Sequence, residues 1–399
     1  MSEGLDQAVA DWCRLPEREL MLLLGRVEIT ESCRERISTL LPTGVNVERF
    51  LEICDRHSVG PLAVRQLLRE AEIPSELLET FEHLLGERAK RSRQLADEML
   101  RVVGFLEQEG IPVVPYKGPV LGHLLYEDMA LRPCIDLDFL VRRSDSQRAK
   151  SLLLRQGYRA VRELTPCQEQ AVARADIHHE LLRENPEIAV DLHWQLMPDY
   201  ACIRFDSDAL LAHASKISLR GVTVRTFRPE DQVLILSAHT AKHFGERFLW
   251  INDLAQLIRT TPQIDWRWVG SEAQRLGIQR IFRVCLRLVE RLLDTDLPSG
   301  ARAGFPADPQ VDRLAAKILD VFWTVPLDEA PWREKTAWSL RIRERWRDRA
   351  GYLLGLTRIY ATPTSHDWEA VPLPDRLFFL HYALRPFRVA AKYACGMKE

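Results

Sequence analysis

Two aspartates separated by one residue are the most chemically suggestive feature of this sequence. Asp136 and Asp138 lie in an otherwise apolar run from Ile135 to Val141. Side chains alternate between the two faces of a β-strand, so both carboxylates should point the same way, with Cα atoms about 6.6 Å apart. Two like charges this close in an apolar setting are unfavourable unless a cation neutralises them. The pair therefore predicts a site for a hard divalent cation such as Mg²⁺.

A third aspartate, Asp191, lies in a second strand-like alternation, with His193 on the same face. Three carboxylates on neighbouring strands can hold two metal ions. Asp176 and Asp199 compete for the third position but lack the strand setting. A histidine near Asp191 could form a hydrogen bond to a metal ligand, or it could simply pack in the core. These histidines are His178, His179 and His193.

A strand-to-helix turn precedes the aspartate pair. β-Branched residues after Ile111 are followed by Lys117 and Gly118, a proline, and a short helical apolar spacing. The start of a helix favours phosphate through its N–H groups and its dipole. Lys117 and Gly118 are therefore candidate nucleotide-binding residues. For Lys117, a solvated turn residue is the alternative interpretation.

Arg132 is a second candidate for phosphate binding. Pro133 should hold it in an extended conformation directly before the aspartate strand. A salt bridge to Asp128 or Glu127 is the alternative role for this side chain.

A third group of candidates lies on a helix predicted from Asp231 to His243. His239 and His243 are four residues apart and share a helical face, and Lys242 lies close to it. The motif lacks the glutamate arrangement of zinc proteases, which makes a structural histidine pair the alternative. We expect Lys242 and His243 to line the cleft and to meet the nucleotide or the acceptor.

The elements that must position these residues divide the chain into three parts: helices over 1–110, a β-rich part over 111–228 and helices over 229–399. Predicted helices include 75–106, which should lie across the sheet, and 336–360. In the β-rich part, 178–183 and 188–194 should form a hairpin, and 222–227 should be a strand outside the main sheet. The fold class is therefore α+β, with helical regions around a mixed sheet.

The composition is that of an ordinary globular protein, with 46% hydrophobic and 28% charged residues and a net charge of −2. No overall basic field indicates nucleic-acid binding. The eight cysteines have no zinc-binding spacing and are interpreted as reduced thiols. The start of the sequence does not resemble a signal peptide, and no apolar run predicts a membrane span. We therefore expect a cytoplasmic protein.

The order of these motifs resembles the nucleotidyltransferase superfamily of the DNA polymerase β type. The chain is more closely similar to the group described as bacterial uncharacterised nucleotidyltransferases. The stretches that carry the resemblance are 116–118, 132–141, 190–194, 239–253 and 373–388. One position departs from the superfamily, because Pro119 stands where a second glycine or a serine is usual. Proline offers neither an N–H nor a hydroxyl to a phosphate.

The resemblance implies a mixed-sheet nucleotidyltransferase core that moves an NMP group from an NTP, with ATP as the first expectation, to an acceptor with release of pyrophosphate. Asp136, Asp138 and Asp191 would be the catalytic metal ligands, for Mg²⁺ or Mn²⁺. Because Pro119 removes phosphate contacts from the turn, Lys117 and Arg132 would supply part of the triphosphate binding.

Two other functions stay open at this point. One is a non-catalytic module that binds a nucleotide or a partner, which Pro119 favours. The other is a toxin-type or defence-type enzyme that modifies a protein or a tRNA. The acceptor is not identified by the sequence, although a small molecule, peptide or protein is favoured over nucleic acid.

Overall fold

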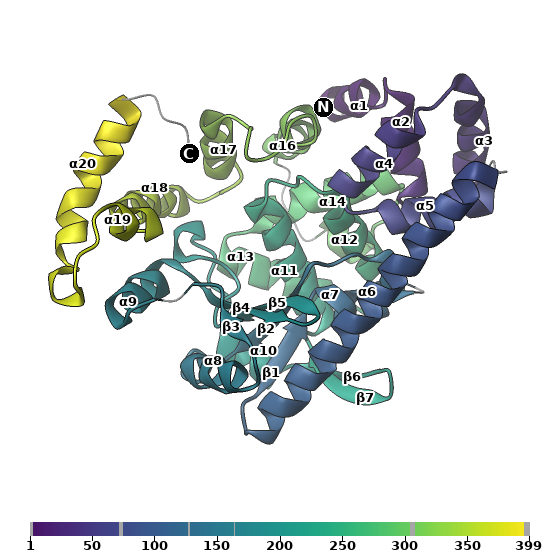
Figure 1. Cartoon of the computed structure of the whole chain (residues 1–399). Helices are drawn as coiled ribbons and strands as arrows, with labels where there is room; N and C mark the ends of the chain where they lie inside the picture. Colours follow the sequence, from purple (N-terminus) through teal and green to yellow (C-terminus); the bar gives the residue numbers. More distant parts are fainter. Residues whose placement is uncertain (1–2, 72–74, 127, 163, 304–307, 395–399) are drawn as a thin grey trace.

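The computed structural model describes residues 3–71, 75–126, 128–162, 164–303 and 308–394. Helices form the first part of the chain (Figure 1). They are α1 (Glu3–Trp12), α2 (Pro16–Leu24), α3 (Glu31–Leu40), α4 (Val47–Arg56), α5 (Gly60–Glu70) and the long α6 (Ser75–Gln108). Pro16 and Pro61 occupy the first turns of α2 and α5, where a missing N–H costs no hydrogen bond.

The middle of the chain alternates strands and helices. Its strands are β1 (Val113–Tyr116), β2 (Asp136–Val141), β3 (Arg159–Ala160), β4 (His178–Glu184), β5 (Glu187–His193), β6 (Ser215–Leu219) and β7 (Val222–Thr226). Its helices are α7 (Gly118–Leu125), α8 (Ser146–Arg155), α9 (Pro166–Ala175) and α10 (Ser207–Ala212).

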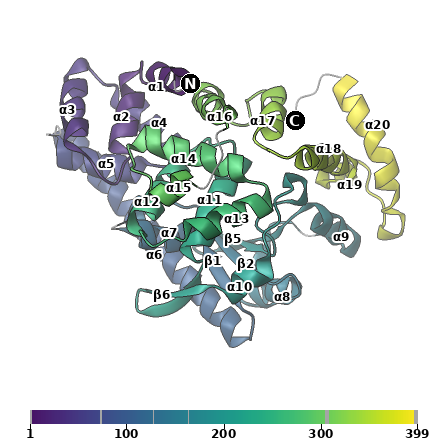
Figure 2. The same cartoon turned by 180° about the vertical axis from the view of Figure 1, so that it is seen from behind.

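The last part of the chain is helical again. Its helices are α11 (Pro229–Lys242), α12 (Phe248–Thr260), α13 (Trp266–Leu276), α14 (Gln279–Leu293), α15 (Ser299–Ala303), α16 (Gln310–Lys317), α17 (Trp332–Arg341), α18 (Trp346–Ala361), α19 (Ser365–Ala370) and α20 (Leu380–Ala394). Seen from both sides, α20 lies at the margin of the molecule opposite α3 (Figures 1 and 2). No helix among the described residues combines the length and the apolar character needed to cross a bilayer.

The main sheet has the strand order β1-β2-β5-β4-β3 and is mixed. β2 and β5 are parallel, while the other neighbouring strands are antiparallel. The predicted hairpin is β4 and β5, and β7 lies outside the main sheet, paired with β6. These elements confirm the predicted α+β class.

One face of the sheet is a hydrophobic core closed by α6 and α8. Leu137 and Phe139 of β2 and Leu192 of β5 pack there, together with Met99 and Val102 of α6. The opposite face is apolar only at one end, where Ile235 of α11 packs with residues of β1 and β2. The acidic residues of β2 and β5 share this second face, so it carries the polar groups of the sheet.

The first and last helical parts of the chain share a large hydrophobic core. Trp12 and His57 from the first part lie edge-on to Trp323, whose centroid is 5.2 Å from Trp12 and 4.7 Å from His57. Because these parts pack together, the division at residues 110 and 228 marks changes in secondary structure along the chain. That the chain divides into separate domains at these two positions stays a prediction.

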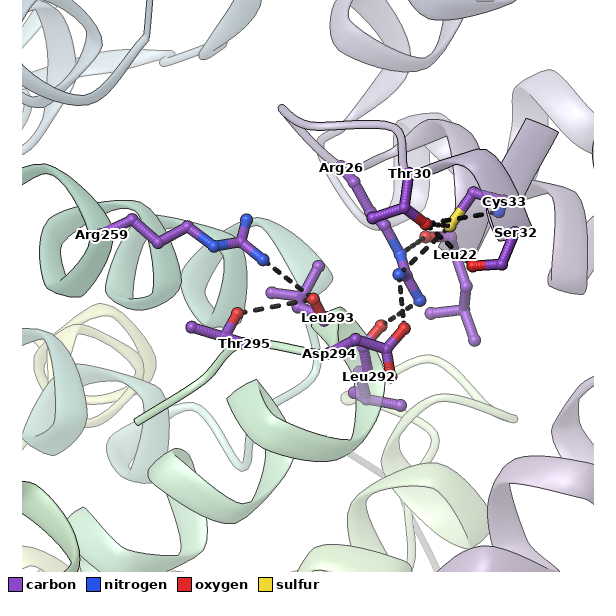
Figure 3. Close-up of polar contacts among 10 residues, drawn as sticks. All are labelled: Leu22, Arg26, Thr30, Ser32, Cys33, Arg259, Leu292, Leu293, Asp294 and Thr295. Carbon is purple, nitrogen blue, oxygen red and sulfur yellow. Dashed lines mark hydrogen bonds and ion pairs between the residues drawn. The ribbon is translucent and has the colours of Figure 1, made fainter. Parts of the chain in front are cut away.

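Arg26, just after α2, ties these two helical parts together (Figure 3). This buried side chain donates from Nε to the carbonyl of Leu22 at 3.0 Å and from Nη2 to the carbonyl of Leu292 at 2.7 Å. Its Nη1 pairs with Asp294 at 2.8 Å. The contact therefore fixes the end of α14 against α2.

Replacing Arg26 by methionine is expected to lower the free energy of unfolding by about 2–3 kcal/mol, because buried carbonyls lose a charged donor. Chemical denaturation measures this change. Asp294→Asn is the matched control, since that carboxylate is 70% exposed and its ion pair should contribute less than about 1 kcal/mol. Equal losses in the two variants would contradict this assignment.

Candidate active site

The two strands that carry the predicted acids lie side by side. β2 and β5 are parallel neighbours, and Asp138 is in register with Asp191. Register partners on adjacent strands share a face, so both carboxylates project from the same side of the sheet. Asp136 lies two residues earlier on β2, beside Ala189. The pairing thus joins acids that are more than fifty residues apart in the sequence.

His193 completes the cluster. This buried imidazole has its Nε2 3.0 Å from Oδ1 of Asp138. Single donor atoms of Asp138, Asp191 and His193 all lie within 4.8 Å of one another. The group contains two of the three predicted acids, with a histidine where Asp136 was expected.

The other histidines of this region lie on opposite faces of the sheet. His178 pairs with His193 across the strands, with ring centroids 4.7 Å apart, and its Nε2 lies 3.7 Å from Asp191. The same nitrogen is 3.5 Å from Glu180. His179 instead contacts the ring of Trp194 at 4.8 Å. His178 and His193 therefore border the carboxylates, and His179 packs elsewhere.

Lys117 approaches the same carboxylate from the turn between β1 and α7. Its Nζ is 3.5 Å from Oδ1 of Asp138 and 5.1 Å from the centroid of the Tyr116 ring. The backbone at Lys117 has a φ of 59°, and Gly118 follows with a φ of 42°. A positive φ at a lysine is strained by about 1–3 kcal/mol, and such strain concentrates at functional sites. The turn therefore holds the ammonium over Asp138.

The charges around the cluster separate the ionisation of its two acids. Burial alone would raise the pKa of Asp138, but the Lys117 ammonium and the hydrogen bond from His193 hold it below the ordinary value. Burial raises the pKa of Asp191 to about 7, and the carboxylates of Asp138 and Asp136 add to this effect. Burial also lowers the pKa of His193 to about 4, so this ring is neutral at pH 7. An ionised carboxylate only accepts, so Nε2 of His193 donates to Asp138.

The donor set fits a divalent cation. Its carboxylates are those of Asp138 and Asp191, with the imidazole of His193 and the carboxyl of Asp136 beside them, and the pKa of Asp136 is raised by burial and by Asp138. Crowded carboxyls of this kind are stabilised in their ionised form by a bound cation. The donor separations are also comparable with the roughly 4 Å between opposite ligands of one Mg²⁺ ion.

Lys242, the last residue of α11, lies close enough to interact electrostatically with Lys117 and Asp138, whereas His243 belongs to an aromatic cluster. Burial and Lys117 lower the pKa of Lys242, and Asp138 opposes this shift. The His243 ring lies 4.7 Å from His239 and 5.3 Å from Trp250, and burial with Lys242 lowers the pKa of His243 to about 3. Of these predicted residues, Lys117 contacts an acid of the cluster, Lys242 interacts with it through its charge, and His243 is neutral.

Arg132 makes a buried ion pair that was not predicted from the sequence. Its Nε and Nη2 donate to Asp253 of α12 at 2.9 and 2.7 Å, and Tyr126 donates to the same carboxylate at 2.8 Å. Arg132 is 5% exposed and Asp253 is fully buried. Of the expected partners, Asp128 caps the N–H of Ala130, and Glu127 lies outside the described residues. The lone acid in the apolar run of α12 was the available signal, because a buried aspartate requires a partner.

A groove of about 920 Å³ adjoins the start of β2. Pro133 and Ile135 form part of its wall, and Ile135 is 71% exposed. The remaining wall carries charges of both signs. They include Asp55, Arg56, Arg88, Glu246, Arg247, Asp328 and Lys335. The groove is large enough for a second substrate and is not strongly basic.

The raised pKa of Asp191 gives a testable pH dependence. In the metal-free protein this carboxyl is protonated below pH 7, whereas in the unfolded chain it ionises near pH 4. The folded state therefore binds an extra proton between these values, and its stability falls as the pH rises through this window. Asp191→Asn removes this loss. We expect thermal unfolding with a chelator present to show the variant gaining melting temperature over the wild type from pH 5 to pH 8.

Asp199→Asn is the control for this experiment, because Asp199 is exposed and its carboxylate accepts a hydrogen bond from the side-chain amide of Gln195. Its melting temperature should keep a constant difference from the wild type. If the curves of melting temperature against pH for Asp191→Asn and the wild type are parallel, the pKa of Asp191 is not raised by its neighbours.

Comparison with known proteins gives low structural likeness and a clear sequence family. An antigenic nucleotidyltransferase-like protein from Paracoccidioides brasiliensis is 14% identical, with a TM-score of 0.30 over 52% of this chain and 95% of that chain. A tRNA-processing enzyme in an apo form is 12% identical, with a TM-score of 0.23 over 81% of this chain and 92% of that chain. None of the curated proteins is significantly similar.

The family assignment rests on the sequence. Residues 43–294 match the family described as "Uncharacterised nucleotidyltransferase", and this range is more than half of the chain. It contains the β2 and β5 acids, the turn at Lys117 and the helix that carries Asp253. The chain therefore belongs to this family of uncharacterised nucleotidyltransferases, as the order of its motifs predicted.

Proposed function

We propose that this protein transfers a nucleoside monophosphate group from a nucleoside triphosphate, with ATP as the first expectation, to an acceptor and releases pyrophosphate. The observation that carries the proposal is the register that sets Asp138 beside Asp191, with His193 against Asp138. Family membership supports the transferase chemistry.

In this proposal Asp136, Asp138 and Asp191 hold Mg²⁺ or Mn²⁺, with His193 beside them. A bound divalent ion supplies charge stabilisation to the phosphates and lowers the pKa of the attacking hydroxyl. Lys117 and Lys242 are the cations on this face that would contact phosphate oxygens, and Gly118 permits the tight turn into α7. His243 would border the nucleotide. Arg132 would act by fixing the segment before β2 through Asp253.

The reaction forms a bond between the acceptor oxygen and the α-phosphorus. It breaks the bond from that phosphorus to the oxygen it shares with the β-phosphate, and pyrophosphate leaves with the electron pair. Asp191 takes the acceptor proton in this proposal. This role suits a carboxylate at the edge of the cluster, since Lys117 and His193 both contact Asp138 instead.

The groove beside Ile135 is the proposed entrance for the acceptor. Its mixed charges match a small polar molecule, a peptide or a protein surface better than nucleic acid, which requires a mainly basic surface. The expected cytoplasmic location stays a prediction, as does a toxin-type or defence-type role.

The test is an incubation of the protein with ATP labelled on its α-phosphate, Mg²⁺ or Mn²⁺, and acceptor pools that contain sugars, peptides, proteins or tRNA. Label should move into one pool with matching release of pyrophosphate. A binding module without catalysis is the second candidate, because Pro119 offers no N–H and Arg132 is committed to Asp253. Calorimetric binding of ATP without pyrophosphate release over long incubation would favour that module.

A further inference from the structure

Lys117 contacts Asp138, the central carboxylate of the site. Its ammonium and the His193 ring both contact Oδ1 of Asp138. A second cation, Lys242, lies close enough for Lys117 to lower its pKa. Asp138 thus already has a lysine counter-ion, whereas the cationic partner shown for Asp191 among the described residues is the His178 ring at 3.7 Å.

The backbone of the turn directs the Lys117 side chain toward Asp138. Its positive φ and the following Gly118 set the direction in which the side chain leaves the turn. The Tyr116 ring lies beside the ammonium, which adds a cation–π contact. The side chain is nonetheless 19% exposed, so the ammonium can turn toward a ligand that arrives on the open side.

We infer that Lys117 is an exchangeable counter-ion that leaves Asp138 for the phosphates of the nucleotide when a divalent cation arrives. This inference rests on the proposed function. A divalent ion on Asp138 repels an ammonium that touches the same carboxylate, so the two cations exclude each other. Phosphate oxygens are the anionic groups that the nucleotide would offer to the displaced ammonium.

The consequence is that metal and nucleotide each strengthen the binding of the other. Without a nucleotide, the metal must displace Lys117 with no new partner for the ammonium. With a nucleotide, the displaced ammonium gains a phosphate partner. Linkage between two ligands is reciprocal and commonly amounts to about 5–150-fold in affinity. Lys117 would therefore set the order of loading, with little metal bound before the nucleotide.

Mn²⁺ binding followed by electron paramagnetic resonance tests this inference without turnover. Titrations of the full chain are run with and without a non-hydrolysable ATP analogue, and protein-free samples correct for Mn²⁺ held by the analogue. In the wild type, the analogue should tighten Mn²⁺ binding at least about 5-fold. In Lys117→Met, Mn²⁺ alone should bind about 10-fold tighter than in the wild type, and the analogue should tighten Mn²⁺ binding by a smaller factor than in the wild type.

Two further variants control this experiment. Lys117→Arg keeps the charge and should keep the coupling. Lys317 ends α16 and pairs with Glu334 at 2.9 Å, so it has its own partner outside the site. Lys317→Met should leave both Mn²⁺ titrations unchanged. Thermal unfolding of each variant confirms that it is folded.

The outcomes separate this inference from the proposed function. If Lys117→Met binds Mn²⁺ alone no tighter than the wild type, the exchange is overturned, while nucleotidyl transfer can still stand. If the folded wild type binds no Mn²⁺ even with the analogue, both proposals fail. Coupling in the wild type that Lys117→Met reduces supports the exchange, whether or not an acceptor has been found.

Discussion

Asp138→Asn is expected to reduce nucleotidyl transfer by about a thousandfold, the largest effect that we predict for one substitution. Asparagine keeps the size of the side chain but removes the charge that contacts Lys117 and His193 and that would bind the metal. The measurement is the rate of label transfer from ATP labelled on the α-phosphate, at saturating metal and nucleotide.

The matched control for Asp138→Asn is Asp199→Asn, an equal chemical change at an exposed position. Its transfer rate should equal that of the wild type. Transfer by Asp138→Asn within a few-fold of the wild type would refute the assigned role of this carboxylate, provided that both variants are folded.

Arg132→Met is expected to lower the free energy of unfolding by about 3–5 kcal/mol, because it leaves a fully buried carboxylate without its cation. Tyr126 alone would still donate to Asp253 in that variant. Urea denaturation measures the change. The double variant with Asp253→Leu should recover part of the loss, since it removes the buried charge together with its partner.

An exposed ion pair is the comparison for this prediction. Arg220 pairs with Asp97 at 2.6 Å, with side chains that are 40% and 65% exposed, and Arg220→Met should cost less than about 1 kcal/mol. If Arg132→Met unfolds like the wild type but binds ATP weakly, Arg132 contacts phosphate and is not a structural residue.

Much of the fold follows from local sequence patterns. The apolar spacing of residues 75–106 predicts a long helix, and α6 spans Ser75–Gln108. The turn composition between 183 and 188 predicts the β4–β5 hairpin. These predictions succeed because periodicity and turn chemistry act within a few residues.

Long-range polar contacts were harder to predict. The expected helix over 336–360 is interrupted between α17 and α18, where Arg343 turns inward, stacks on Tyr352 at 4.3 Å and donates to the carbonyl of Ala201 at 3.1 Å. The Arg132–Asp253 pair spans 121 residues in the same way. Such contacts depend on tertiary packing, which no local pattern encodes.

The candidate site was partly predictable. Alternation places Asp136 and Asp138 on one face of β2, but only the parallel register of β5 brings Asp191 and His193 to Asp138. The contact between Lys117 and Asp138 depends on a positive φ, which lysine rarely adopts. The residue types indicated the chemistry, and the strand order determined which of them meet.

The most direct measurement is a crystal structure of the protein soaked with Mn²⁺ and a non-hydrolysable ATP analogue, with the ion located by its anomalous scattering. The proposed function predicts a peak bonded to Asp138 and Asp191, next to the α-phosphate, with Lys117 turned toward the phosphates. A nucleotide bound elsewhere, or an ion that leaves the Lys117–Asp138 contact intact, would contradict it.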